Sequence, residues 1–173
     1  MAYWSDSGVR ATSFAGGSGT SSSPYLISTP AQLGYLCYLI NSSTSTSYKS
    51  KYYKLTADLN LNANYWIPIG YTSTSYAFTG NFDGDGHTIS YITINGTYSG
   101  CGLFGYAGSS ATIKNLKMTK LVITNAESST PTYVGCILGY SSNTTISNVY
   151  LENPCIFDHN TSIHYVGGIV GRV

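Results

Sequence analysis

Short apolar motifs recur along the second half of the chain. A heptad with the pattern threonine, isoleucine, two polar or small residues, then apolar–any–apolar begins at Thr88, Thr112 and Thr145. A strand this short cannot bury its apolar side alone, so the copies are expected to stack as parallel strands about 4.8 Å apart. The predicted columns of stacked side chains are Ile89, Ile113 and Ile146; Ile92, Leu116 and Val149; and Ile94, Met118 and Leu151.

A second motif alternates with the first. GLFG at 102–105 recurs as CILG at 136–139 and GIVG at 168–171, so the copies follow one another at a nearly constant spacing. Repeats of this length also occur in helical repeat proteins, but those require apolar residues at helical spacing, which is missing here. The pattern therefore predicts an all-β fold, a right-handed parallel β-helix (solenoid) with loops of variable length.

One segment has a helical pattern instead. Within residues 29–41 the apolar side chains fall at positions 33, 36, 37 and 40; Thr29 suits the N-cap, Pro30 the first turn and Asn41 the exit. An open end of stacked strands would recruit other chains, so this helix is expected to cap the N-terminal end.

The whole chain is expected to form a single β-helix domain. Residues 1–24 are interpreted as a leader or edge segment, 25–50 as an N-terminal strand with the capping helix, and 51–173 as the coils. Because the pattern stops in mid-strand at Val173, we expect a fragment of a longer repeat protein, with further coils of the same chain beyond it.

Composition narrows the function classes. The 173 residues are 42% hydrophobic and only 9% charged, with a formal net charge of +1, which disfavours both disorder and nucleic-acid binding. No apolar run is long enough to span a bilayer. Ser/Thr/Tyr-rich, weakly charged β chains suit an extracellular surface. The four cysteines lack C-x-x-C spacing, and buried free thiols are favoured over disulfides.

The segment Asp83-Gly-Asp85-Gly-His87 is the one cluster of candidate metal ligands in the sequence. Alternating aspartates could hold Ca²⁺, but an EF-hand needs a bidentate glutamate at the twelfth position of its loop, where this chain has Ile94. The favoured interpretation is a glycine corner in which the aspartates bind local backbone amides. No cofactor is expected.

Catalytic signatures are weak. None of His87, His159 and His164 belongs to an H-E-x-x-H motif. Asp58 could stack with Asp83 or Asp85 on adjacent coils as a carboxylate pair, which leaves a carbohydrate-active β-helix as a residual alternative. We expect no enzyme activity in this chain.

Tyrosines near the predicted corners are the best candidates for ligand contact. Tyrosine supplies contact area at low entropic cost, and its ring stacks on sugars or proteins. The alternative is that these rings stack only on one another between coils. The candidates are Tyr71, Tyr76, Tyr98, Tyr106, Tyr133, Tyr140 and Tyr165.

Several of these segments together resemble the GLUG-motif β-helix proteins. The resemblance is carried by GGSGTSSSPYLISTPAQLGYL (16–36), YKLTADLNL (53–61), WIPIG (66–70), FTGNFDGDGHTI (78–89) and GLFG (102–105), with IKNL at 113–116. It covers nearly the whole chain from about residue 14. Its motifs are structural, so no catalytic residues carry over.

The resemblance implies a secreted or cell-surface bacterial protein. Such a module would be non-catalytic and would use its loops for adhesion to a host surface glycoprotein, glycan or immunoglobulin. The alternative is a passive stalk or accessory domain of a secreted enzyme, either a metallopeptidase or a carbohydrate-active enzyme.

Overall fold

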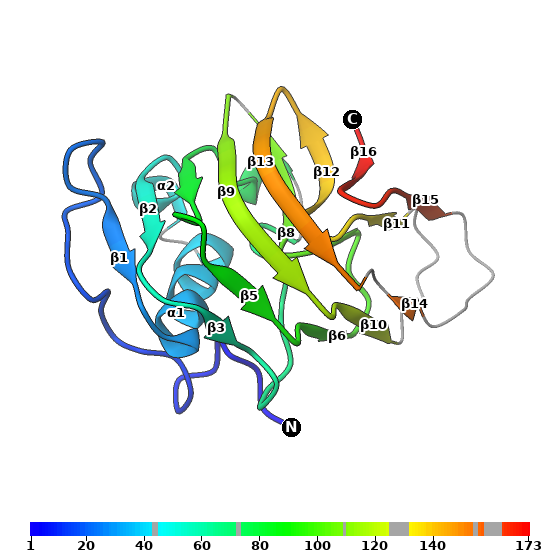
Figure 1. The fold of residues 1–173 in the computed structure, drawn as a ribbon, viewed down its shortest axis with the longest axis horizontal. Coiled ribbons are helices and arrows are strands. Elements are labelled where there is room, and N and C mark those ends of the chain that lie inside the picture. Colours follow the sequence, from blue (N-terminus) through cyan, green and yellow to red (C-terminus); the bar gives the residue numbers. More distant parts are fainter. Residues whose placement is uncertain (43–44, 72–73, 109, 125–131, 154–155, 158–163) are drawn as a thin grey trace.

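The computed structural model describes residues 1–42, 45–71, 74–108, 110–124, 132–153, 156–157 and 164–173. The chain is mostly β, as predicted. Its largest sheet has the strand order β1-β2-β4-β9-β5-β3, with β13 paired to β9 (Figure 1). These strands are β1 (Tyr25–Ile27), β2 (Tyr52–Leu55), β3 (Leu59–Asn60), β4 (Asn81–Asp83), β5 (Thr88–Ser90), β9 (Thr112–Thr119) and β13 (Thr145–Glu152).

Three smaller sheets have three strands each, in the orders β6-β10-β14, β7-β11-β15 and β8-β12-β16. Their strands are β6 (Thr93–Asn95), β7 (Gly100–Cys101), β8 (Phe104–Gly108), β10 (Val122–Thr124), β11 (Thr132–Val134), β12 (Leu138–Ser142), β14 (Ile156–Phe157), β15 (His164–Val166) and β16 (Val170–Arg172). The helical elements are α1 (Pro30–Asn41), α2 (Ser45–Tyr48) and the 3₁₀ turn η1 (Thr74–Tyr76).

Strand pairing follows one rule throughout the described part of the chain. Every pair of named strands is parallel, and each strand pairs with one that lies a similar length of chain away, as in Tyr25 with Tyr53 and Val122 with Ile156. In Figure 1 the strands accordingly advance from β1 at the left to β15 and β16 at the right. Each successive repeat therefore adds a strand beside its predecessor.

The GLFG-type motifs stack as predicted. Phe104 pairs with Leu138, and Leu138 pairs with Val170. Ile69 of the WIPIG segment bridges to Phe104 and extends the same column upstream. The ring of Phe104 lies 5.0 Å from that of Phe78 between centroids and belongs to the buried core.

The predicted register of the first heptad is wrong. Ile113 and Ile146 do pair, as expected, but Ile89 pairs with Met118 instead of Ile113. The true partner of Ile113 in the preceding strand is Phe82. The first heptad is thus displaced along β9 from the alignment that the similarity of the heptads had suggested.

A glycine corner explains the shift. The long strand β9 pairs with β4 along its first half and with β5 along its second half, and residues 84–87 connect the two short strands. Gly84 lies against the backbone of Asn115 and Leu116, where a Cβ atom would come within 2.4 Å of the Asn115 carbonyl oxygen. Leu116 pairs with Val149 as predicted, whereas Ile94 pairs with Ile123 instead of Met118.

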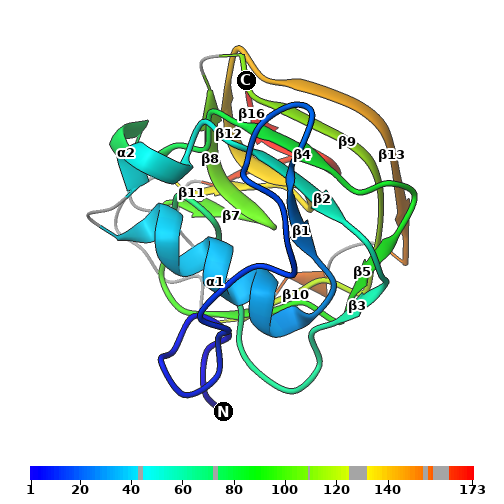
Figure 2. The same ribbon diagram turned by 90° about the vertical axis from the view of Figure 1, so that its left-hand side faces the viewer.

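Helix α1 lies where the sequence predicted a helix. The Thr29 side chain accepts a hydrogen bond from the Gln32 amide, and Pro30 occupies the first turn. The predicted apolar stripe at positions 33, 36, 37 and 40 is buried. Figure 2 shows the helix at the end of the molecule that carries β1, with the segment before β1 crossing in front of it. Asn41 ties α1 to the WIPIG segment, since its side chain donates to the Pro68 carbonyl (3.1 Å) and accepts from the Gly70 amide (2.7 Å).

Candidate functional site

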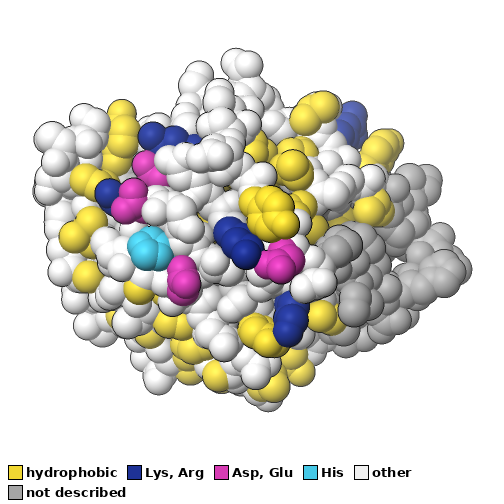
Figure 3. Space-filling view, in the orientation of Figure 1, with side chains coloured by type: hydrophobic (Ala, Val, Ile, Leu, Met, Phe, Trp, Pro, Cys, Tyr) yellow, Lys and Arg dark blue, Asp and Glu magenta, His cyan; other side chains and the backbone are white. Residues whose placement is uncertain are grey.

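The outer face of the largest sheet carries most of the charges that the structure describes. Lysines and carboxylates alternate over it (Figure 3), and most of them form ion pairs. Lys54 Nζ lies 3.0 Å from Asp85, Lys114 Nζ lies 3.3 Å from Asp83, and Lys117 Nζ lies 2.8 Å from Glu152. The face is therefore strongly polar but nearly neutral.

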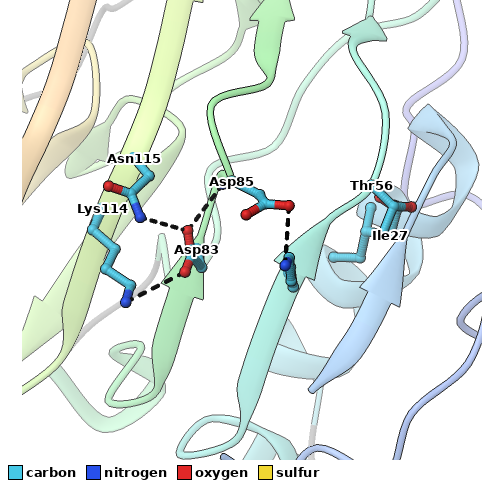
Figure 4. Close-up of polar contacts among 7 residues, drawn as sticks. Ile27, Thr56, Asp83, Asp85, Lys114 and Asn115 are labelled. Atoms are coloured by element: carbon cyan, nitrogen blue, oxygen red, sulfur yellow. Dashed lines mark hydrogen bonds and ion pairs between the residues drawn. The ribbon is translucent and has the colours of Figure 1, made fainter. Parts of the chain in front are cut away.

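Asp83, at the end of β4, is the centre of a cluster of polar contacts on this face (Figure 4). Its Oδ1 accepts hydrogen bonds from the Asp85 amide and from Asn115 Nδ2, both at 2.9 Å. Burial opposes ionisation of Asp83, but the hydrogen bonds from Asn115, the Asp85 amide and Lys114 outweigh it and lower the pKa. The predicted binding of a local backbone amide is confirmed for Asp83, which accepts from the Asp85 amide. The carboxylate of Asp85 instead forms an ion pair with Lys54.

Asp58 has other partners, at the start of β5. Its Oδ1 accepts from the Thr88 amide at 2.9 Å and lies 3.1 Å from His87 Nδ1. The Thr88 bond and then the His87 bond lower the pKa of Asp58. A general acid for glycoside hydrolysis needs a raised pKa, and both Asp58 and Asp83 are shifted the other way. Among the described residues, no group of three or more His, Cys, Asp or Glu side chains is placed to hold a metal ion.

A groove of about 520 Å³ opens beside the Asp83 cluster. It runs over β1, β2, β4 and β9, and its wall combines ion-paired side chains with the partly exposed ring of Tyr52. Its lining residues are Ser21, Pro24, Leu26, Tyr52, Tyr53, Lys54, Asn81, Asp83 and Lys114. The groove offers both hydrogen-bonding groups and an aromatic surface, which suits a polar ligand.

Four of the seven predicted tyrosines come together on β8, β11, β12 and β15. Ring centroids lie 5.5 Å apart for Tyr106–Tyr140, 5.3 Å for Tyr133–Tyr140 and 5.5 Å for Tyr133–Tyr165. The Arg172 guanidinium lies 5.1 to 5.9 Å from three of these ring centroids and donates to the Tyr133 hydroxyl at 3.1 Å. We call these five residues the tyrosine–arginine cluster.

The exposed fraction of the tyrosine residues rises from Tyr106 to Tyr165. Tyr106 is 8% exposed and Tyr165 is 42% exposed. Burial raises the pKa of the Tyr106 hydroxyl. The cluster thus joins one buried ring, two partly exposed rings and one exposed ring, which pack against each other at tilted angles.

The other predicted tyrosines lie elsewhere. Tyr71 and Tyr98 form an edge-to-face pair with centroids 5.0 Å apart, and burial raises the pKa of Tyr98. Tyr76 lies in η1 and is partly exposed. The structure therefore brings together four candidates and separates three from them.

The cysteines divide into two classes. Cys37 and Cys101 are buried free thiols, as predicted, and burial raises the pKa of each to about 12. Cys136 is disulfide-bonded, so the expectation of a free thiol is wrong there. Cys155, like His159, lies outside the described residues.

One polar arrangement was missed by sequence reasoning. Asn148 Nδ2 donates to Asn115 Oδ1 at 2.8 Å, and Asn115 in turn donates to Asp83, so one side chain from each of three successive strands joins a ladder. Both asparagines adopt a left-handed backbone conformation, with φ of 54° and 53°, which asparagine tolerates well. The signal was present, since Asn occupies the fourth position of the second and third heptads, where the first heptad has Tyr91.

Comparisons with known proteins give two relatives. The chain is 32% identical over 180 residues to Halomucin of Haloquadratum walsbyi, a match that covers 98% of this chain and 2% of Halomucin. It is also 32% identical over 146 residues to a "Putative Gly-rich membrane protein" of Evansella cellulosilytica, covering 80% of this chain and 16% of that protein. The chain therefore spans a small part of the length of each relative.

No protein-family model matches the chain, and no solved structure is significantly similar to it. Within the described residues, no helix has the length and apolar character required to cross a membrane.

Proposed function

We propose that the chain forms part of a right-handed parallel β-helix and acts as a non-catalytic binding module on a cell surface. The parallel pairing of strands that are separated by similar lengths of chain supports the helical winding, because strands of successive turns pair in this way. The burial of α1 at one end of the stack supports its role as a cap.

The observation that carries the binding role is the tyrosine–arginine cluster. Tyrosine rings with an adjacent cation bind the apolar faces and polar groups of sugars and glycoproteins. The rings of Tyr133, Tyr140 and Tyr165 lie beside one another, and the Arg172 guanidinium contacts all three. The proposed ligand is therefore a host glycan or a glycoprotein that displays one, immunoglobulins included.

The surface location rests on two further observations. The relatives are named Halomucin and a membrane protein. The disulfide at Cys136 suits an oxidising compartment, since disulfides are rare in the cytosol. Both observations favour a secreted or surface-attached chain.

The test is a glycan array combined with pull-downs from mucin, serum and epithelial extracts. Tyr165→Ser should weaken capture, because it removes the accessible ring of the cluster. Tyr150→Ser is the matched control, since Tyr150 is 60% exposed and lies on the charged face, and it should bind as the unmodified chain does. Equal binding by the two variants would contradict the assignment to this cluster.

A passive stalk or an accessory region of a secreted enzyme is the second candidate. It is favoured by the internal pairing of groups: the tyrosine rings contact each other and three lysines of the charged face contact carboxylates. Such surfaces can serve stability alone. If the chain bound no glycan on the array and captured nothing in the pull-downs, the result would favour the stalk or accessory region.

A further inference from the structure

A second hollow of about 370 Å³ lies at the edge of the charged face. Its lining includes the aromatic residue Tyr91, the cation Lys120 and the apolar residues Leu121 and Val122. The remaining lining residues are Asn62, Thr93 and Asn153. An aromatic surface, a cation and two carboxamides thus surround one space.

Lys120 differs from the other lysines of this face. Lys54, Lys114 and Lys117 each lie within 3.3 Å of a carboxylate, whereas Lys120 forms no ion pair with any described residue. Its Nζ instead donates to the Tyr91 hydroxyl at 2.7 Å and lies 4.4 Å from the ring centroid. These contacts hold the ammonium beside Tyr91, and no carboxylate of a described residue neutralises its charge.

The hollow is built from equivalent backbone positions of three successive strands. Ser90 pairs with Thr119 and Thr119 pairs with Glu152, so Tyr91, Lys120 and Asn153 each follow a strand at the same level. All three adopt a left-handed conformation, with φ of 60°, 54° and 56°. This conformation is unfavourable for tyrosine and lysine, and the shared geometry turns all three residues at the same corner of the stack.

We propose that this hollow binds an acidic saccharide unit, such as a uronate. The Tyr91 ring would stack on the apolar face of the sugar, Lys120 would bind its carboxylate by a charge-assisted hydrogen bond, and the amides of Asn62 and Asn153 would bind its hydroxyl groups. The inference rests on the proposed binding function and adds a second site and a ligand charge to it.

The experiment is calorimetric titration of the full chain with an oligogalacturonate and with its methyl ester, which has the same rings without the charge. The acid should bind more tightly than the ester, and its affinity should fall as salt is added. Lys120→Asn removes the cation while retaining a residue that tolerates the left-handed conformation, as Asn153 does. It should weaken binding of the acid by about tenfold.

Two further variants locate the effect. Tyr91→Asn should weaken the ester, because the stacking ring is lost, and should weaken the acid at least as much, because Lys120 also loses the hydroxyl and ring that position its ammonium. Lys49→Gln removes the same formal charge from a site where the lysine donates to the Ser75 carbonyl, and it should leave affinity within about twofold. Unchanged thermal unfolding of each variant shows that the fold is retained.

Equal affinity for acid and ester, no binding of either, or an unaltered Lys120→Asn would each overturn this site. If the array still shows ligands whose capture depends on Tyr165, the proposed function stands and the acidic-saccharide site alone fails. If the array and the extracts are also blank, both fail.

Discussion

The last glycine of the GLFG-type motif is the position where the packing of the strands can be tested most directly. In the middle copy this residue is Gly139, at which a Cβ atom would lie 2.7 Å from the Cys101 amide nitrogen, 2.7 Å from the Tyr133 carbonyl oxygen and 2.8 Å from the Gly100 Cα. All three contacts are backbone atoms of neighbouring strands. No side-chain rotation can relieve them.

Gly139→Ala should therefore strongly destabilise the fold. Overpacking a tight site costs about 1–3 kcal/mol. Because only backbone displacement makes room here, we expect the free energy of unfolding to fall by about 3 kcal/mol. For a chain of this size, such a loss lowers the melting temperature by about 6–12 °C. Gly168→Ala is the matched control, since Gly168 begins the next copy of the motif and has no atom within 4 Å of the added Cβ.

Urea unfolding followed by far-UV circular dichroism measures both variants. Gly168→Ala should stay within about 0.5 kcal/mol of the unmodified chain. A Gly139→Ala variant of unchanged stability, or equal losses in the two variants, would refute the close approach of the strands at this motif. If Gly139→Ala expresses poorly, hydrogen exchange of β11 and β12 in the remaining soluble fraction gives the same comparison.

Two more predictions concern titratable groups. The lowered pKa of Asp83 means that its ionised form stabilises the fold above the unfolded value of about 3.9 and that this contribution is lost as pH falls through the lower folded pKa. Asp83→Asn should therefore flatten the acid limb of stability measured by urea unfolding below about pH 4; an identical limb would contradict the hydrogen-bonded geometry. Cys37 and Cys101, buried with pKa values of about 12, should resist iodoacetamide at pH 8 until the chain unfolds, while Cys136 should react only after reduction; peptide mapping by mass spectrometry distinguishes these cases.

Local signals predicted α1 well. The N-cap threonine, the proline in the first turn and the apolar stripe all lie within one segment, so their physics does not depend on the rest of the fold. The GLFG-type columns were also predictable, because each copy ends on a glycine that the neighbouring backbones require. In α1 and at the motif glycines, the residues that form the sequence pattern are the same residues that the packing requires.

The register of the first heptad was not predictable from similarity alone. Residues 88–94 resemble residues 112–118, yet the corner at Gly84 shifts the partner of Ile89 along β9 to Met118. Nothing in the heptad itself encodes that shift, because it arises from the backbone of Gly84 packing against Asn115 and Leu116. The longer spacing that the other strand pairs share, such as β8 with β12, is the constraint that would have corrected it.

The wrong register of the first heptad also prevents prediction of the proposed saccharide site. If Ile89 paired with Ile113, Lys120 would stand beside Gly96; because Ile89 pairs with Met118 and Ser90 with Thr119, Lys120 stands beside Tyr91. The ammonium of Lys120, the ring of Tyr91 and the amides of the two asparagines come from separate segments. Their proximity can therefore be recognised only when the strand pairing is known. The tyrosine–arginine cluster was easier to anticipate, since Tyr106 and Tyr140 directly follow the GLFG and CILG motifs, whose register was evident.

The stacked core residues and the residues at the corners between strands place different requirements on the sequence. Core columns such as Ile69, Phe104 and Leu138 must be apolar and of suitable volume, because a void or an overfilled site there costs stability. The corners require only a tolerated backbone conformation, and they accept Tyr91, Lys120 or Asn153 at equivalent positions. Such a stack of strands can therefore vary its surface chemistry at one residue per repeat while its core stays intact.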